Sequence, residues 1–227
     1  MTKYVHDTFH SAWDVAEWDR VPTDDDAIGL ANKGVRIDAA VLYADLADST
    51  GLVKSKTDEY AAEIYKSYVY AASKSIRAHE GVVTAFDGDR VMGLFVGGSK
   101  RNHAAEAAFH LAAIVEDILQ PELEKMYGNS SYTITQKVGI DASKILVSNT
   151  GMRGTNDYVW VGTAANNAAK MAALKLGYTT YATSEVLSVL NAANTTAASD
   201  GNKLWHNLGT SDLGFQLFGT NARKVNI

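Results

Sequence analysis

Apolar and polar positions along the chain follow two different periods, and together they predict a domain that mixes strands and helices. Residues from Ala40 to Asp45 are mostly apolar and indicate a buried strand that ends on an acid. Residues 57–79 repeat apolar side chains at helical spacing, several of them tyrosines, and Gly81 follows as a helix stop. This tyrosine stripe favours packing in the core or at an interface over a cofactor site.

The elements expected after this helix are each bounded by Gly, Pro or polar residues. They are strands at 82–86 and 90–96, a helix at 101–119 that Pro121 ends, strands at 132–141, 144–149 and 157–162, a helix at 164–176, a loop at 191–202 and a terminal hairpin within 204–218. This succession predicts the α+β fold class, with a mixed β-sheet and helices packed on it.

The N-terminal residues, up to about residue 36, do not continue the strand and helix pattern of the rest of the chain. Phe9 and Trp13 recur at helical spacing, so a short amphipathic helix is expected at about 7–19. We therefore divide the chain into a helical N-terminal extension, residues 1–36, and a larger domain, residues 37–227. The helix either packs on its own domain or forms an arm laid over a partner chain, and the sequence leaves both open.

Composition narrows the functional classes. The chain has 227 residues, 46% apolar and 21% charged, which is ordinary for a globular protein. There is no cysteine, which argues against disulfides or thiolate metal sites and is typical of a cytoplasmic protein. The net charge of -5 argues against general nucleic-acid binding. No apolar run approaches ~18 residues, so no membrane span is expected, and the N-terminus lacks the pattern of a signal peptide.

Two acids at strand ends carry the candidate chemistry. Asp45 ends the first strand before a turn of small and polar residues, and Asp89 follows the hairpin signal Asp87-Gly88. Carboxylates on adjacent turns of one sheet can share a pair of divalent ions, and amides at the start of a helix face an anion. Taken alone, Asp45 could equally be a solvated acid beside a helix N-cap.

Several motifs in order resemble the class III nucleotidyl cyclase catalytic domain. They are Asp45-Leu-Ala-Asp-Ser-Thr50, Gly88-Asp89-Arg90-Val91-Met92, Val138-Gly139-Ile140-Asp141, and the spaced set Gly162, Asn166 and Lys170. The resemblance covers residues 37 to about 190. The residue sequence of the first two motifs most resembles that of the bacterial anti-phage pyrimidine cyclases, which make cyclic UMP or cyclic CMP.

This resemblance implies a fold and an activity. The fold is the ferredoxin-like class III cyclase homology domain. The activity is metal-dependent cyclisation of a pyrimidine nucleoside triphosphate, with UTP preferred, to the 3′,5′-cyclic nucleotide and pyrophosphate. The product would be a second messenger in anti-phage defence, read by a separate effector protein. The expected cofactors are two divalent cations, Mn²⁺ or Mg²⁺, and the expected assembly is a homodimer.

The same resemblance assigns roles to residues. Asp45, Asp89 and the carbonyl of Leu46 hold the metals, and Arg90 pairs with the triphosphate unless it is only an outward hairpin charge. The turn amides cradle the phosphates; they belong to Ala47, Asp48, Ser49 and Thr50.

The late helix is expected to act from the other subunit. Asn166 and Lys170 stand four apart and so share one helix face, from which they would contact the ribose and the transferring phosphoryl group. Lys170 stands where the family has Arg, which keeps the charge and loses the planar fork. Asn166 could instead be a cap of its own helix.

The base-reading positions depart most from the purine cyclases. Ala85 and Val159 occupy them, and neither can form polar contacts with a purine edge. Tyr43 shares the strand face of Asp45 and could stack on or bond a smaller base, with Trp160 and Thr163 as further candidates. Two other functions remain open: an adenylate cyclase with an atypical base pocket, and a catalytically silent nucleotide-binding dimer module, against which the intact acids argue.

Overall fold

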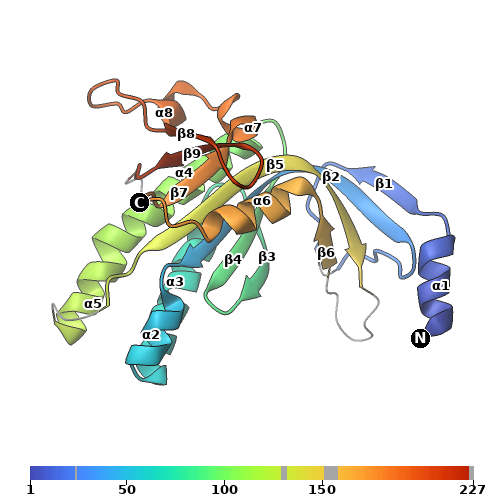
Figure 1. Ribbon diagram of the computed structural model, residues 1–227, viewed down its shortest axis with the longest axis horizontal. Helices are drawn as coiled ribbons and strands as arrows, with labels where there is room; N and C mark the ends of the chain where they lie inside the picture. The colour runs from blue at the N-terminus through green and yellow to red at the C-terminus, as the bar shows by residue number, and fades with distance from the viewer. Residues whose placement is uncertain (24, 129–131, 151–157, 225–227) are drawn as a thin grey trace.

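Two 14-residue strands, β2 (Lys33–Leu46) and β5 (Gln136–Asn149), run antiparallel through the centre of the fold (Figure 1). The computed structural model describes residues 1–23, 25–128, 132–150 and 158–224. Nearly every residue of β2 and β5 is buried or half-buried, because helices cover both faces of the sheet.

The other strands extend this central pair into a nine-stranded mixed sheet ordered β3-β4-β2-β5-β7-β9-β8, with β1 on β2 and β6 on β5. The pairs β1–β2 and β5–β7 are parallel and the rest are antiparallel, as a mixed sheet requires. Their bounds are β1 (Asp14–Trp18), β3 (Val82–Asp87), β4 (Arg90–Phe95), β6 (Tyr158–Val161), β7 (Thr180–Thr183), β8 (His206–Thr210) and β9 (Gln216–Thr220).

Helices lie on both faces of this sheet, and the predicted α+β class is confirmed. The α3–α4 pair covers one face and α6 covers the other. The helices are α1 (Thr2–His10), α2 (Ser49–Ser55), α3 (Asp58–Ala78), α4 (Lys100–Ile114), the π-helix η1 (Val115–Leu119), α5 (Gln120–Tyr127), α6 (Thr163–Ala172), α7 (Ser184–Leu187) and α8 (Ala192–Thr195).

Successive residues of β2 serve two different cores. Leu42 packs with Tyr68 and Phe109 in the cluster under α3 and α4. Val41 packs with Ala168 in the cluster under α6. This two-sided burial follows from the alternation of side chains along a strand, and it explains why the strand reads as a continuous apolar run.

Helix α6 lies unusually close to β5. A Cβ atom on Gly139 would be 2.1 Å from the carbonyl oxygen of Ala168, so only glycine allows this approach. Polar contacts fix the helix in place: the Asn167 side chain donates to Asp141 at 2.8 Å, and Thr183 donates to the same carboxylate at 2.5 Å. The acid is buried, so these bonds hold α6 and β7 against β5.

The predicted N-terminal helix at 7–19 is wrong in its extent. Only Thr2–His10 is helical, and Asp14–Trp18 forms strand β1, which pairs with the start of β2. The helical spacing of Phe9 and Trp13 therefore does not reflect one helix. The proposed domain boundary at residue 36 falls inside β2.

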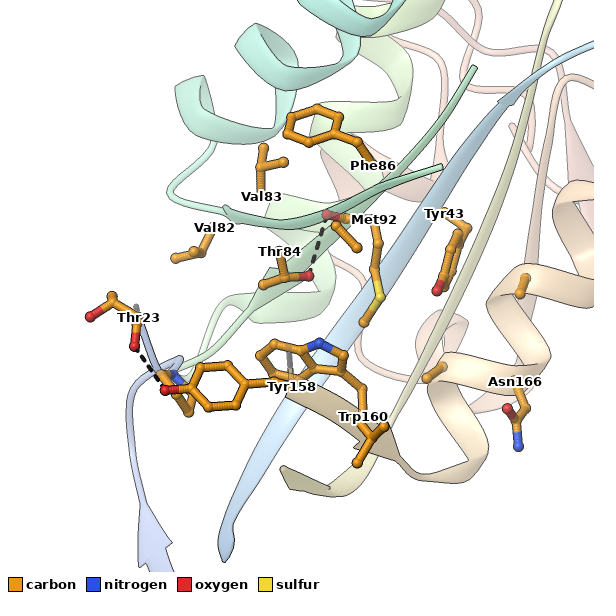
Figure 2. A pocket seen from close by; sticks show the side chains of 15 residues that line it. Thr23, Tyr43, Val82, Val83, Thr84, Phe86, Met92, Tyr158, Trp160 and Asn166 are labelled. Carbon is orange, nitrogen blue, oxygen red and sulfur yellow. Dashed lines mark hydrogen bonds between the residues drawn. The ribbon is translucent and has the colours of Figure 1, made fainter. Parts of the chain in front are cut away.

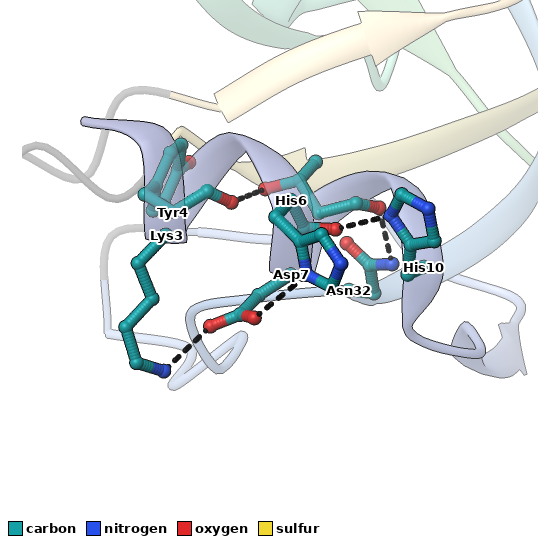
Figure 3. A network of polar contacts seen from close by, with 7 residues as sticks. Lys3, Tyr4, His6, Asp7, His10 and Asn32 are labelled. Atoms are coloured by element: carbon teal, nitrogen blue, oxygen red, sulfur yellow. Dashed lines mark hydrogen bonds and ion pairs between the residues drawn. The ribbon is translucent and has the colours of Figure 1, made fainter.

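Polar contacts attach helix α1 to the domain (Figure 3). The Asn32 side chain donates to the carbonyls of Thr8 and Ser11 at 2.9 and 2.7 Å, and the Tyr4 hydroxyl donates to the carbonyl of Thr150. None of the α1 residues is buried in the single chain, and Phe9 is 81% exposed. Packing of its apolar face within this chain is therefore not observed.

Several element boundaries also differ from the prediction. Pro121 does not end a helix, because it lies in the first turn of α5 directly after the π-helical turn, where its missing N–H is tolerated. The strands expected at 132–141 and 144–149 are one strand, β5. Helix α6 stops at Ala172, and α8 lies within the predicted loop. Residue 157 of the predicted strand lies outside the described residues.

The Gly139 contact generates a stability prediction. Gly139→Ala should lower the free energy of unfolding by about 1–3 kcal/mol, because backbone atoms of α6 must move to admit the methyl group. Urea unfolding measures this. Gly98→Ala is the matched control, since no atom lies within 4 Å of its added Cβ. Equal stabilities of the two variants would contradict the close packing of α6 on β5.

Candidate active site

The predicted metal acids meet at the tips of β2 and the β3–β4 hairpin. Asp45 lies near the end of β2 with a side chain that is 16% exposed, and Arg90 donates to its carboxylate at 3.1 Å. Asp45 is therefore not a solvated acid, and Arg90 is not an outward hairpin charge. Asp87 pairs with Arg90 across the hairpin, so Gly88 and Asp89 form the turn, and the prediction that Asp89 lies just past it is corrected.

The electrostatics of this site reflect burial as well as pairing. Burial raises the pKa of Asp45, and Asp89 adds to this, although the Arg90 guanidinium opposes it. Burial acts to lower the pKa of Arg90, but the carboxylates around it, Asp45 foremost, raise it on balance. Burial therefore outweighs the Arg90 guanidinium in its effect on the pKa of Asp45.

The donor set suits a hard divalent cation. The Oδ2 atom of Asp89 is buried and has no hydrogen-bond partner among the described residues. Ala47 donates its N–H to the carbonyl of Thr135 at 2.8 Å. Because a trans peptide directs C=O and N–H oppositely, the carbonyl of Leu46 points away from β5, toward the β4 side of β2. Two carboxylates and a carbonyl are oxygen ligands of the kind that Mg²⁺ and Mn²⁺ prefer.

The described residues contain no larger cluster of metal-ligating side chains than this pair of acids. Among the described residues, no group of three or more His, Cys, Asp or Glu side chains could hold a metal ion. The Asp45–Asp89 pair is thus the best-supported oxygen site in the described part of the chain.

The turn after β2 leads directly into α2. The amide of Ala47 already donates to the carbonyl of Thr135, so it is not free to bind phosphate as predicted. The amides of Asp48, Ser49 and Thr50 remain as the predicted phosphate donors. Asp48 adopts the left-handed conformation, with φ of 58°, and α2 begins at Ser49 without a side-chain cap. The first amides of a helix lack intrahelical partners, so these amides remain available to an anion.

A separate cavity of about 840 Å³ opens on the α6 face of the sheet (Figure 2). Tyr43, Ala85, Val159 and Trp160 line it, so the predicted base-reading positions gather around one space. Thr163 is the first residue of α6 and does not line it. At Ala85 and Val159, the two predicted base-reading positions, the cavity offers aliphatic surface, and Tyr43 and Trp160 add aromatic surface.

The two predicted helix residues project from α6. Asn166 lines the cavity and is exposed, and Lys170 is exposed one turn further on. Asn166 is not a cap, because Gly162 is the N-cap residue of α6. The cavity lining includes neither Asp45 nor Asp89, so within one chain the structure does not bring Asn166 together with the metal acids.

One cation near the site was not singled out by the sequence. Lys137 lies directly opposite Asp45 in the β2–β5 register, and its side chain is half-buried. It donates to the carbonyl of Tyr178 at 2.5 Å, and burial lowers its pKa. Its position just before the Val138-Gly139 motif is a local signal, but only the strand register shows that it is the cross-strand neighbour of Asp45.

The chain is similar to curated proteins named uridylate cyclase. One, from Xanthomonas perforans, is 42% identical over 205 residues, which covers 90% of this chain and 87% of that protein. Another, from Burkholderia cepacia, is 39% identical over 215 residues, which covers 94% of this chain and 92% of that protein. No protein-family model matches the chain.

The fold is similar to solved nucleotide cyclases. A bacterial light-regulated adenylyl cyclase superimposes with a TM-score of 0.69, and the match covers 83% of this chain and 93% of that chain. The sequence identity of that pair is 19%, so the likeness concerns the fold.

The position of Lys137 generates a binding prediction. Lys137→Gln should weaken binding of inorganic tripolyphosphate, measured by calorimetry with Mn²⁺ present, by about tenfold, because a charged hydrogen-bond donor is lost. Lys54→Gln, which changes an exposed lysine of α2, is the control and should bind as the wild type. Unchanged affinity in Lys137→Gln would remove this residue from the anion site.

Proposed function

The chain belongs to the uridylate cyclase family and is a nucleotidyl cyclase, and on this premise we propose that it converts UTP to 3′,5′-cyclic UMP and pyrophosphate. The observation that carries the choice of a pyrimidine is the cavity on the α6 face. Ala85 and Val159 line it without polar groups for a purine edge, and Tyr43 and Trp160 narrow it with aromatic rings.

The metal acids and their neighbours hold the reacting phosphates. Asp45, Asp89 and the carbonyl of Leu46 would hold two divalent cations, Mn²⁺ or Mg²⁺, which supply charge neutralisation and a lowered pKa of the 3′-hydroxyl when bound. Arg90 and Lys137 bring positive charge to the triphosphate.

The turn amides complete the anion site. Those of Asp48, Ser49 and Thr50 donate to phosphate oxygens at the start of α2. The 3′-hydroxyl attacks the α-phosphorus, and the bond to pyrophosphate breaks. The chain's part is to align these groups and to stabilise the developing charge.

The base is read by shape and by few polar atoms. A uracil ring is smaller than a purine and can stack on Tyr43 or Trp160. Burial raises the pKa of Tyr43, so its hydroxyl stays protonated and can donate to a carbonyl oxygen of the base. The absence of polar side chains at Ala85 and Val159 supports UTP over the purine nucleotides, because hydrogen bonds that would select a purine edge are missing there.

The active site is shared between two copies of the chain. The exposed face of α6 carries Asn166 and Lys170 away from Asp45 and Asp89 of the same chain. In a homodimer, Asn166 of the partner subunit would orient the ribose, and Lys170 of the partner subunit would stabilise the transferring phosphoryl group. Two equivalent sites follow from the two-fold symmetry of such a dimer.

The proposed setting is anti-phage defence in the cytoplasm. Cyclic UMP would act as a second messenger on a separate effector protein. None of the helices in the described part of the chain is long and apolar enough to cross a bilayer. The N-terminal extension, residues 1–36, and the catalytic domain, residues 37–227, would act together, since β1 pairs with β2.

The activity is tested by incubating purified protein with Mn²⁺ and each of the four nucleoside triphosphates, with products identified by mass. UTP should give cyclic UMP at the highest kcat/KM. CTP should be second, because it shares the ring size. Cyclic AMP as the main product would instead establish an adenylate cyclase with an atypical pocket.

Metal-site variants serve as controls for that assay. Asp45→Ala and Asp89→Ala should abolish turnover and leave the fold and the dimer intact, because each carboxylate is expected to act on the cations. A variant with near wild-type turnover would contradict the two-metal assignment. Absence of turnover in the wild type with every nucleotide would favour a silent binding module.

Complementation tests the shared site. Asp45→Ala and Lys170→Ala homodimers should each be nearly inactive, and mixing them should restore roughly one quarter of wild-type activity, because half of the dimers then hold one intact site. Subunit exchange is verified by mass spectrometry of the mixed dimer. Demonstrated exchange without recovered activity would contradict a site built from two chains.

A further inference from the structure

Three tyrosine hydroxyls converge on the backbone of the turn that follows β2. The Tyr68 hydroxyl donates to the carbonyl of Asp45 at 3.0 Å, and the Tyr65 hydroxyl donates to the carbonyl of Ser49 at 3.4 Å. Between them, the Tyr132 hydroxyl donates to the carbonyl of Ala47. Every second carbonyl of the turn thus has a tyrosine donor.

Peptide geometry turns these bonds into a constraint on the amides. A planar trans peptide directs its C=O and its N–H to opposite sides. Carbonyls that face the tyrosines therefore leave the N–H groups of Leu46, Asp48 and Thr50 facing away from them.

We propose that Tyr65, Tyr68 and Tyr132 are positioning residues that hold the amides of Asp48 and Thr50 toward the triphosphate of the substrate. They touch neither the nucleotide nor the cations and act through the backbone of the turn. This inference rests on the proposed function, because the anion is the triphosphate of UTP in that scheme.

The tyrosines are themselves held in place. Tyr68, a residue of α3, is fully buried. The backbone N–H of Tyr132 donates to the hydroxyl of Tyr60 at 3.0 Å, and the N–H of Ile134 donates to the Gln120 side chain at 2.8 Å. A donor fixed by packing and by its own hydrogen bonds can determine the orientation of its acceptor.

The turn needs such external support. Asp48 has a positive φ of 58°, which is unfavourable for a residue other than glycine and persists only where the surroundings impose it. Its side chain does not cap α2. The bonds to the carbonyls of Ala47 and Ser49 lie on either side of this residue and restrain its backbone.

The test removes one hydroxyl at a time. Tyr68→Phe and Tyr132→Phe should each raise the KM for UTP and the Ki of inorganic tripolyphosphate by about tenfold, since one hydrogen bond that orders the turn is lost. Amide hydrogen exchange in the peptide that covers residues 46–52 should accelerate in the same variants. Tyr65→Phe, whose side chain is half-buried, keeps the test available if the buried variants do not fold.

Tyr181→Phe is the matched control. Tyr181 is fully buried, and its hydroxyl accepts from the amides of Leu176 and Tyr178 rather than bonding the turn. It should lose stability to a similar degree without a change in Ki or in exchange of the 46–52 peptide. If the Tyr68 and Tyr132 variants match this control in both measurements, the positioning role is overturned.

The outcomes separate this inference from the proposed function. If the wild type cyclises UTP and the Tyr68→Phe and Tyr132→Phe variants behave as the control, the proposed function stands and the positioning role is rejected. A wild type that cyclises no nucleotide would reject the function. Tripolyphosphate binding and amide exchange would still decide whether the tyrosines orient the turn.

Discussion

The register between β2 and β5 is the constraint on which the rest of the structure depends. It sets Tyr43 opposite Gly139 and Asp45 opposite Lys137. Because Gly139 has no side chain, α6 approaches the sheet there and forms one wall of the base cavity. A slip of one residue would reverse every side chain of β2 and move the carboxylate of Asp45 into the core under α3 and α4.

The two faces of the sheet differ in how they are covered and in what they contribute to the candidate site. The α3 face is apolar and fully covered, and its tyrosines reach up to the turn that follows Asp45. The α6 face keeps an open cavity and carries Asn166 on an exposed helix surface. One face therefore holds the backbone proposed to bind phosphate, and the other carries the cavity and helix surface proposed to meet the base and a second subunit.

The sequence predicted the local parts of this site and missed the parts that depend on tertiary pairing. The buried run that ends on Asp45 and the hairpin that carries Asp89 have local signals, a burial pattern and a turn dipeptide. Strand β1 has none, because it exists through its pairing with β2 and its own residues are mostly exposed. Lys137 likewise becomes a candidate site residue only through the strand register.

The same reasoning explains why the tyrosine stripe of α3 was interpreted as packing alone. Its spacing identifies the face of the helix that is buried, and Tyr68 is indeed in the core. Periodicity gives no information about where a hydroxyl at the end of a long side chain finds its acceptor. That acceptor is the carbonyl of Asp45, 23 residues earlier and next to the last residue of β2. A buried hydroxyl needs a hydrogen-bond partner, and this carbonyl supplies one. The need to satisfy the hydroxyl therefore couples the core of the domain to the backbone beside its candidate phosphate site.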